Sequence, residues 1–260
     1  ASQPSTIKDI TRGQWARAWA HLDGWFLVAL GMGVVVSILS LARLFDFLLL
    51  HHEVVTMAFF FGLVLVSIIH VGRTVPNWNA SRVGALLLGV VVAVGLAFVA
   101  PAEANASFGY LVIRGVVAIG SMILPGLSGS FVLMLMGNYV LVIRGIKEFD
   151  FGVILPMGLG CAVGLLGFVQ VLGWALKRAP HVVISLMTGF VLGSLLTIWP
   201  WKVQDVETIT VAGESKDVVT GYTWELPTQF DATFFIAIAL MIGGGIFLHL
   251  VQTFATEQKS

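Results

Sequence analysis

The sequence predicts an all-α integral membrane protein with about six transmembrane helices and one broken re-entrant hairpin, arranged as an inverted repeat. Three observations predict this fold class: the composition, the apolar stretches and an internal repeat. Of the 260 residues, 58% are hydrophobic and only 11% are charged. Soluble domains have about 25% charged residues, so this chain could not cover a water-facing surface. The 14 Lys and Arg balance the 14 Asp and Glu, which argues against a nucleic-acid partner.

A helix needs about 20 mostly apolar residues to cross a bilayer. Six stretches qualify: 25–45, 54–71, 83–100, 153–176, 182–199 and 233–251. The chain is therefore divided into an amphipathic interfacial segment (1–24), first-repeat helices (25–100), a broken re-entrant hairpin (110–145), second-repeat helices (151–199), an extracytoplasmic polar loop (200–231) and a last transmembrane helix with its tail (232–260). Alternating Thr and Val in the polar loop predict a small β-hairpin.

Residues 110–143 form an apolar run that is too long for one crossing. It is interrupted at 125–130, where Pro125 removes a backbone donor and two glycines weaken a helix. Two half-helices around this break predict a hairpin, either re-entrant or fully spanning. With the hairpin adding no net crossing, most Lys and Arg near helix ends fall on one side, which predicts that this side is cytoplasmic.

The chain also repeats itself. Shifted by 127 positions, residues 27–67 align without gaps on 154–194, with ten identities in a Leu-, Val- and Gly-rich background. Three crossings separate the two copies, so they run in opposite directions, as in secondary transporters whose broken helices form a substrate site near the midplane. A hairpin precedes the second copy only, and we therefore expect this chain to lack an N-terminal hairpin.

The break at 125–130 is a candidate anion site. A helix that begins after it would present unpaired backbone N–H groups within the membrane. Ser128 and Ser130 offer hydroxyls and helix caps, and Gly126 and Gly129 allow a ligand close to the backbone. These features suit a phosphate or a carboxylate. The alternative is a structural kink that packs against neighbouring helices.

Three arginines are further candidates for binding an anionic headgroup at the outer leaflet. Arg114 precedes Pro125 by eleven residues, about 16 Å along a helix, and Arg144 follows Ser130 by about 21 Å. Neither is expected at the break, and Arg43 is expected at similar depth. The alternative is that each arginine snorkels to lipid phosphates.

Four segments resemble the bacterial polyprenyl-phosphate transporters, formerly domain-of-unknown-function family 368. They are Ser-Leu-Ala-Arg-Leu at 40–44, Ala-Phe-Phe-Phe-Gly-Leu at 58–63, Ile-Leu-Pro-Gly-Leu-Ser-Gly-Ser-Phe at 123–131 and Gly-Ser-Leu-Leu-Thr-Ile-Trp-Pro at 193–200. The resemblance covers almost the whole chain. It implies a non-enzymatic protein of the bacterial cytoplasmic (inner) membrane that returns undecaprenyl phosphate from the outer to the inner leaflet, for recycling in cell-envelope polysaccharide synthesis. It also implies two hairpins with a Pro-Gly-x-Ser-Gly element, of which this chain has one.

The expected substrate site comprises Arg43, Arg114, Pro125, Gly126, Ser128, Gly129, Ser130 and Arg144. The alternative function is a secondary transporter of a small anion or ion, which would need a closed aqueous cavity. A lipid phosphatase is disfavoured because the spans hold almost no His or acidic residue at mid-depth, and a structural subunit stays open. No cofactor or metal is expected, and a homo-oligomer stays open. A proton or sodium gradient could drive transport, with Asp46, Glu148 and Asp150 as the candidate carriers.

Overall fold

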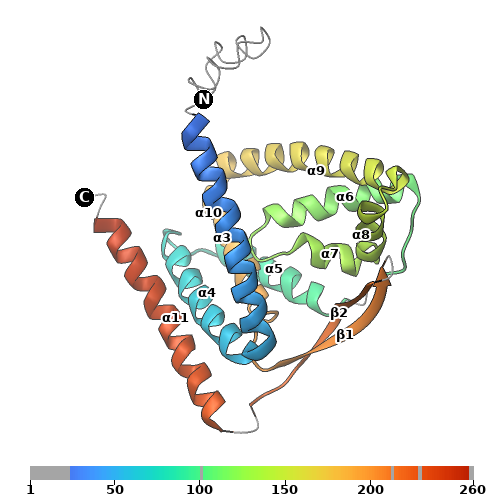
Figure 1. Ribbon diagram of the computed structural model, residues 1–260. Coiled ribbons are helices and arrows are strands. Elements are labelled where there is room, and N and C mark those ends of the chain that lie inside the picture. The colour runs from blue at the N-terminus through green and yellow to red at the C-terminus, as the bar shows by residue number, and fades with distance from the viewer. Residues whose placement is uncertain (1–23, 100–101, 212–213, 228–229, 258–260) are drawn as a thin grey trace. The chain divides into compact units, whose positions relative to one another are not determined.

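The computed structural model describes residues 24–99, 102–211, 214–227 and 230–257 (Figure 1). The chain divides into two compact units, residues 1–53 and 54–260, which are described separately. The first unit contains α3 (Gly24–His51), which continues six residues beyond the predicted stretch 25–45. The predicted interfacial segment 1–24 lies, apart from its last residue, outside the described residues.

The second unit is mostly helical. Its helices are α4 (Glu53–Arg73, which begins at the boundary), α5 (Ala80–Ala97), α6 (Phe108–Ile123), α7 (Gly129–Leu135), α8 (Tyr139–Lys147), α9 (Phe151–Arg178), α10 (Pro180–Ser194) and α11 (Ala232–Glu257). Strands β1 (Lys202–Val211) and β2 (Glu214–Trp224) pair in an antiparallel hairpin, which confirms the strand prediction for the polar loop.

Five of the described helices are long and apolar enough to cross a bilayer: α3, α4, α5, α9 and α11. The bent pair α7–α8 would make a sixth span if it crosses as one unit. The protein is therefore an all-α, multi-pass membrane protein, as predicted.

One predicted span is shorter than expected. The stretch 182–199 was predicted as a full span, but α10 ends at Ser194 after 15 residues. The following residues form tight turns, in which Leu196 donates to Gly193 and Trp199 donates to Leu196. From residue 195 onward the backbone N–H groups bond to the carbonyl three residues back and not four, so the α-helical pattern ends five residues before Pro200.

The helix boundaries confirm the internal repeat. Moving both bounds of α3 by 127 positions gives 151 and 178, which are the bounds of α9. Moving the first residue of α4 by the same amount gives 180, the first residue of α10. The repeat is therefore seen in the positions where helices begin and end, as well as in the identical residues.

Glycine contacts extend the repeat to packing. A β-carbon at Gly62 of α4 would collide with the backbone of Met241 of α11. A β-carbon at Gly189 of α10, which lies 127 positions after Gly62, would collide with the backbone of Leu86 of α5. In a membrane, such small residues let helix backbones approach closely. The second helix of each repeat thus crosses another helix at the equivalent glycine.

The partner helices α11 and α5 also have a glycine at each of these two crossings. Gly244 of α11 lies against the carbonyl of Phe59, and Gly89 of α5 lies against the carbonyl of Leu186. Leu186 follows Phe59 by 127 positions, whereas Gly244 follows Gly89 by 155, because the β-hairpin is inserted before α11. Helix α11 is therefore the counterpart of α5, a relation that the sequence comparison did not detect.

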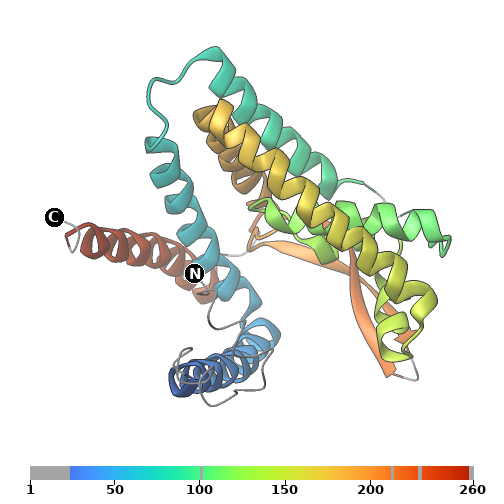
Figure 2. The same ribbon diagram turned by 90° about the horizontal axis from the view of Figure 1, so that it is seen from above.

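The direction of these helices fits an inverted repeat. Gly62 lies against Met241 and Val66 lies against Gly245 one turn later, so α4 is parallel to α11. Gly189 lies against Leu86 and Gly193 lies against Ala93, so α10 is parallel to α5. Consecutive helices α4 and α5 run in roughly opposite directions (Figures 1 and 2). Helices α4 and α10 are therefore opposed, as the repeat predicts.

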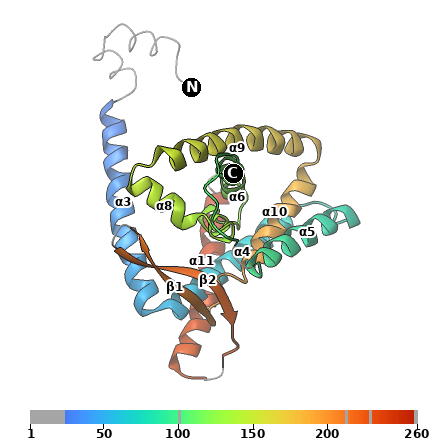
Figure 3. The ribbon, with the colours of Figure 1, turned by 90° about the vertical axis from the view of Figure 1, so that its right-hand side faces the viewer.

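Two tryptophans hold the β-hairpin to the end of α10. The indole nitrogen of Trp224 donates to the carbonyl of Leu196 at 2.8 Å. The indole nitrogen of Trp199 donates to the carbonyl of Glu225 at 3.1 Å. These bonds join the base of the hairpin, visible in Figure 3, to the turn after α10.

Candidate functional site

The helix is interrupted where the sequence predicts. Helix α6 ends at Ile123, and Leu124 takes an extended conformation (φ −77°, ψ 124°), as the residue before Pro125 should. Gly126 has φ +87°, a left-handed value that favours glycine. The chain becomes helical again only at Gly129. The expectation of a broken helix at 125–130 is confirmed.

Both glycines of the break serve packing. A β-carbon at Gly126 would lie 2.8 Å from the carbonyl oxygen of Phe190 on α10. One at Gly129 would lie 2.8 Å from the carbonyl oxygen of Ala118 on α6. The break is thus held between α10 and α6, and for these two glycines the structural alternative accounts for the residue type.

The two serines are different. Ser128 stands at the N-cap position of α7, but its side chain makes no capping hydrogen bond. Instead, the hydroxyls of Ser128 and Ser130 lie 2.8 Å apart, and both residues are exposed. The prediction that their side chains cap the helix is wrong, because the hydroxyls pair with each other. Helix α7 has only seven residues, so this hydroxyl pair is the main polar feature of the break.

An apolar cavity of about 310 Å³ adjoins the break. Pro125 forms part of its wall. The other lining residues come from α4 (Ser67, Ile68, Val71) and α10 (Ile184, Met187, Thr188, Val191). This volume is near the lower end of the range for small-molecule sites. Of the residues at 125–130, Pro125 is the one that lines this cavity, three positions before Ser128.

A second bend follows, which the sequence analysis did not predict. Helices α7 and α8 are inclined by 112° to each other. Gly137 at the joint has φ +73°, and a β-carbon there would collide with the backbone of Ala102. The fully buried Asn138 makes two hydrogen bonds with the backbone of Asn105, at 2.8 Å and 2.9 Å. This pair of bonds, with Ala102 donating to Leu135 at 2.7 Å, holds the 102–107 loop on the joint.

Arg114 lies under that loop and is fully buried. Its guanidinium carbon is 3.8 Å from the ring centroid of Tyr110, and its Nη2 atom donates to the carbonyl of Glu103 at 3.2 Å. The Nε and Nη1 atoms are buried and have no hydrogen-bond partner among the residues that the structure describes. Arg114 therefore does not snorkel to lipid.

An uncompensated buried cation is costly, and unpaired buried donors are rare in folded proteins. Two buried donors on a permanent positive charge are suited to binding an anion. Arg114 lies nine residues before the end of α6, about 14 Å along the helix, so it and the serine pair are separate places, as the sequence analysis expected.

The other two predicted arginines belong to other helices. Arg144 is exposed on α8. Its predicted distance of 21 Å from Ser130 assumed one continuous helix and is wrong, because the bend at Gly137 redirects the chain. Arg43 lies on α3 in the first unit.

Of the acids proposed to carry an ion, Asp150 has a structural role. Its carboxylate accepts a hydrogen bond from the backbone of Gly152 at 2.8 Å and caps α9. Within the described ranges, no three His, Cys, Asp or Glu side chains are grouped so that they could hold a metal ion.

Comparison with known proteins decides the family. Residues 1–216 match the family described as undecaprenyl phosphate translocase-like. The chain belongs to this family. It is 35% identical over 243 residues to a polyprenyl-phosphate transporter of Vibrio cholerae serotype O1, covering 92% of this chain and 79% of that protein.

A second relative of the family is a polyprenyl-phosphate transporter of Staphylococcus aureus. It is 28% identical over 194 residues, covering 67% of this chain and 68% of that protein. No solved structure matches the chain. Both relatives are named as transporters, and the resemblance seen in the sequence is confirmed at the level of family, with a non-enzymatic class.

Sequence reasoning missed the residues around Arg114. Gly137 and Asn138 follow each other within an apolar run, and such a pair is a turn signal. It could have predicted the second bend. Nothing in the sequence indicates that the loop containing Asn105 pairs with Asn138, because the contact spans 33 residues.

Proposed function

We propose that this protein moves undecaprenyl phosphate from the outer to the inner leaflet of the bacterial cytoplasmic membrane, where the carrier is reused in cell-envelope polysaccharide synthesis. Membership of the translocase-like family and similarity to two polyprenyl-phosphate transporters support the substrate class. The observation that carries the proposal is the break at 125–130, which contains an exposed hydroxyl pair and, in Pro125, part of the wall of an apolar cavity.

The two parts of the break match the two parts of the lipid. The hydroxyls of Ser128 and Ser130 can donate to phosphate oxygens, whereas the apolar cavity accepts the first part of the prenyl chain. Pro125 and the packed Gly126 and Gly129 keep the chain in this broken shape. The rest of the prenyl chain stays in lipid.

The arginines attract the headgroup in this proposal. Arg43 and Arg144 concentrate it at the outer face, and Arg114 binds it through Nε and Nη1. Because these two atoms are covered, the 102–107 loop has to open first. Movement of the α4–α11 pair relative to the α5–α10 pair then exposes the headgroup to the other leaflet.

A transporter of a small soluble anion is the alternative. The cavity at the break favours the lipid, because its walls are almost entirely apolar side chains and a free anion would lose its hydration there without compensation. Transport against a lipid gradient needs an energy source, and we propose a proton or sodium gradient with Asp46 and Glu148 as candidate carriers. An ionophore that collapses the gradient should stop net transport.

The proposal can be tested with the full-length protein in liposomes. Polyprenyl phosphate is added to the outer leaflet, and its accessibility to an external phosphatase is followed over time. We expect a protein-dependent loss of accessibility, which the substitution Ser130→Leu abolishes. Uptake of inorganic phosphate serves as the parallel measurement for the alternative function. Unchanged lipid accessibility with rapid phosphate uptake would refute the lipid assignment.

A further inference from the structure

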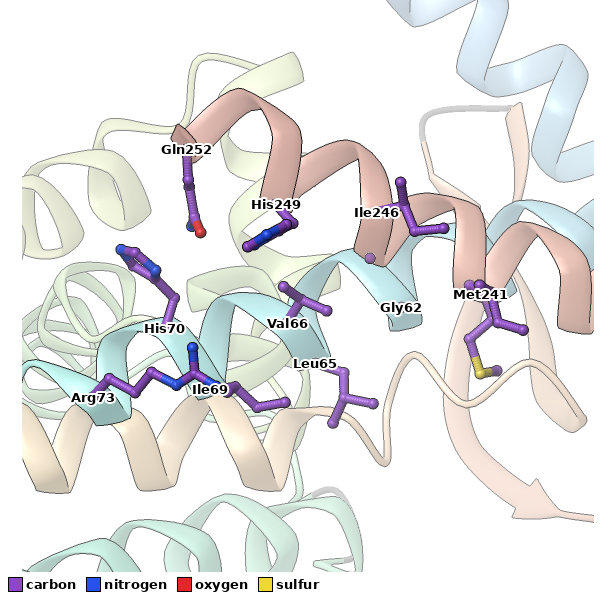
Figure 4. A pocket seen from close by; sticks show the side chains of 12 residues that line it. Gly62, Leu65, Val66, Ile69, His70, Arg73, Met241, Ile246, His249 and Gln252 are labelled. Carbon is purple, nitrogen blue, oxygen red and sulfur yellow. The ribbon is translucent and has the colours of Figure 1, made fainter. Parts of the chain in front are cut away.

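A second cavity lies between α4 and α11, away from the break. The two helices are in backbone contact at Gly62 and Gly244 and diverge beyond this crossing. The space between them is about 550 Å³ (Figure 4). It is thus larger than the cavity at the break and extends to Arg73.

The helix pair α10 and α5 is the repeat equivalent of α4 and α11 and can be compared with it. In α10 and α5, a β-carbon at Gly193 would lie 2.6 Å from that of Ala93, so these helices stay in contact beyond the crossing. The residue of α4 at the position of Gly193, 127 positions earlier, is Val66. Its larger side chain lines the cavity. Val66 also lies against Gly245 of α11, where a β-carbon would be 2.9 Å from its Cγ2 atom, so both pairs are still in contact one turn beyond the crossing.

The cavity between α4 and α11 has a basic and polar end. One end of the cavity holds His70, Arg73, His249 and Gln252, which Figure 4 shows on the two diverging helices. The repeat equivalents of His70 and Arg73 are Thr197 and Pro200. The basic residues at this end are thus specific to α4, because the repeat-equivalent positions in the second copy are not basic.

The remaining walls are apolar. Leu65 and Ile69 of α4 and Ile242 and Ile246 of α11 also line the cavity. None of the twelve lining residues is acidic. An arginine presents a fork of donors that suits phosphate, and imidazole and amide groups add further donors. A ligand with an anionic head and an apolar chain complements this arrangement.

We propose that the cavity between α4 and α11 binds the phosphate headgroup of the lipid at Arg73, His70 and His249, with its prenyl chain between Leu65, Ile69 and Ile246. Arg73 belongs to the loop that the sequence places on the cytoplasmic side, so this is the site that receives the lipid before release to the inner leaflet. The identity of the lipid rests on the proposed function, whereas the amphiphilic character of the site does not.

A metal ion does not explain the polar end. Two histidines contribute imidazoles, but the described residues offer no third His, Cys, Asp or Glu to complete a metal site. Adventitious contact with bulk phospholipid is the remaining explanation, and the experiment separates it by competition.

The test uses the full-length protein in phosphatidylcholine liposomes with a polyprenyl phosphate that carries a diazirine in its first isoprene units. After illumination, labelled peptides are located by mass spectrometry. We expect labelling of residues 62–73 and 241–252, in addition to the break. Unlabelled polyprenyl phosphate should compete, whereas polyprenol and inorganic phosphate should not.

Two variants and a control sharpen the result. Arg73→Gln should reduce labelling of α4 and α11 about tenfold or more, because a hydrogen bond to a charged group is lost. Ile246→Trp, which fills the apolar part, should have the same effect. Both should leave labelling at 125–130 intact. Arg178→Gln, at an exposed arginine of α9, should behave as the unsubstituted protein.

The possible failures are distinguishable. If the unsubstituted protein moves no polyprenyl phosphate, the proposed function is wrong. If it moves the lipid but α4 and α11 are unlabelled, or are labelled equally in Arg73→Gln, this inference alone is overturned. Equal competition by polyprenol would also overturn it, because the phosphate would then play no part, and full competition by inorganic phosphate would show a free-anion site instead.

Discussion

Arg114 allows the sharpest test of how the headgroup is bound. The substitution Arg114→Gln removes the buried positive charge and both unpartnered donors, Nε and Nη1. A hydrogen bond to a charged group contributes about 1.5–3 kcal/mol. If both donors bind phosphate oxygens, their loss costs about 3 kcal/mol or more, which raises the dissociation constant of the lipid at least about a hundredfold.

Ligand-induced stabilisation measures this change without a transport assay. At a lipid concentration of about 100 times the dissociation constant, the unsubstituted protein should gain about 2.7 kcal/mol of unfolding free energy. At the same concentration, Arg114→Gln should gain only about 0.4 kcal/mol, because its dissociation constant then equals the lipid concentration. Thermal unfolding with and without polyprenyl phosphate gives both values.

Lys177→Gln is the matched control, because it removes a cation from the exposed last turn of α9. It should keep the full ligand-induced shift. Polyprenol should stabilise Arg114→Gln and the unsubstituted protein equally. A full phosphate-dependent shift in Arg114→Gln would refute the assignment of the buried guanidinium to the headgroup.

Three further substitutions test the hairpin. Gly137→Ala should lower thermal stability strongly, because it combines a left-handed backbone with a collision against the facing loop, whereas Gly158→Ala, which has open space around it, should change stability little. Asn138→Ala should cost about 1–3 kcal/mol of unfolding free energy through its two lost hydrogen bonds, and an unchanged unfolding temperature would contradict the loop attachment. Replacing Ser128 and Ser130 together by Ala should reduce lipid transport at least tenfold in the liposome assay while leaving thermal stability nearly unchanged, since neither hydroxyl caps α7.

The parts of the fold that depend on local sequence were predictable. Long apolar stretches identified the spanning helices, and the proline of the break fixed the end of α6 because its effect acts on neighbouring residues. The repeat was detectable because glycines at helix crossings, such as Gly62 and Gly189, occupy equivalent places. Helix α10 was overestimated because hydropathy continues through its terminal turns, whereas the helix does not.

The surroundings of Arg114 could not be predicted in the same way. Whether an arginine in an apolar helix snorkels or is buried depends on what covers it, and the covering loop is placed by Asn138 on another helix. The sequence placed Arg114 on the helix before the break but could not show that two of its donors lack partners among the described residues. Likewise, the cavity between α4 and α11 depends on how these two helices pack, which the sequence does not show.

The glycine crossings also bear on which parts of the protein can shift during a transport cycle. Helix α5 belongs to the first repeat yet is joined to α10 of the second, and α11 of the second repeat is joined to α4 of the first. If the two repeats moved past each other as separate rigid bodies, the backbone contacts between α4 and α11 and between α5 and α10 would be lost. The rigid bodies of an alternating-access cycle should therefore be hybrids, each assembled from one helix of either repeat, and two repeats made as separate polypeptides should fold only when they are produced together.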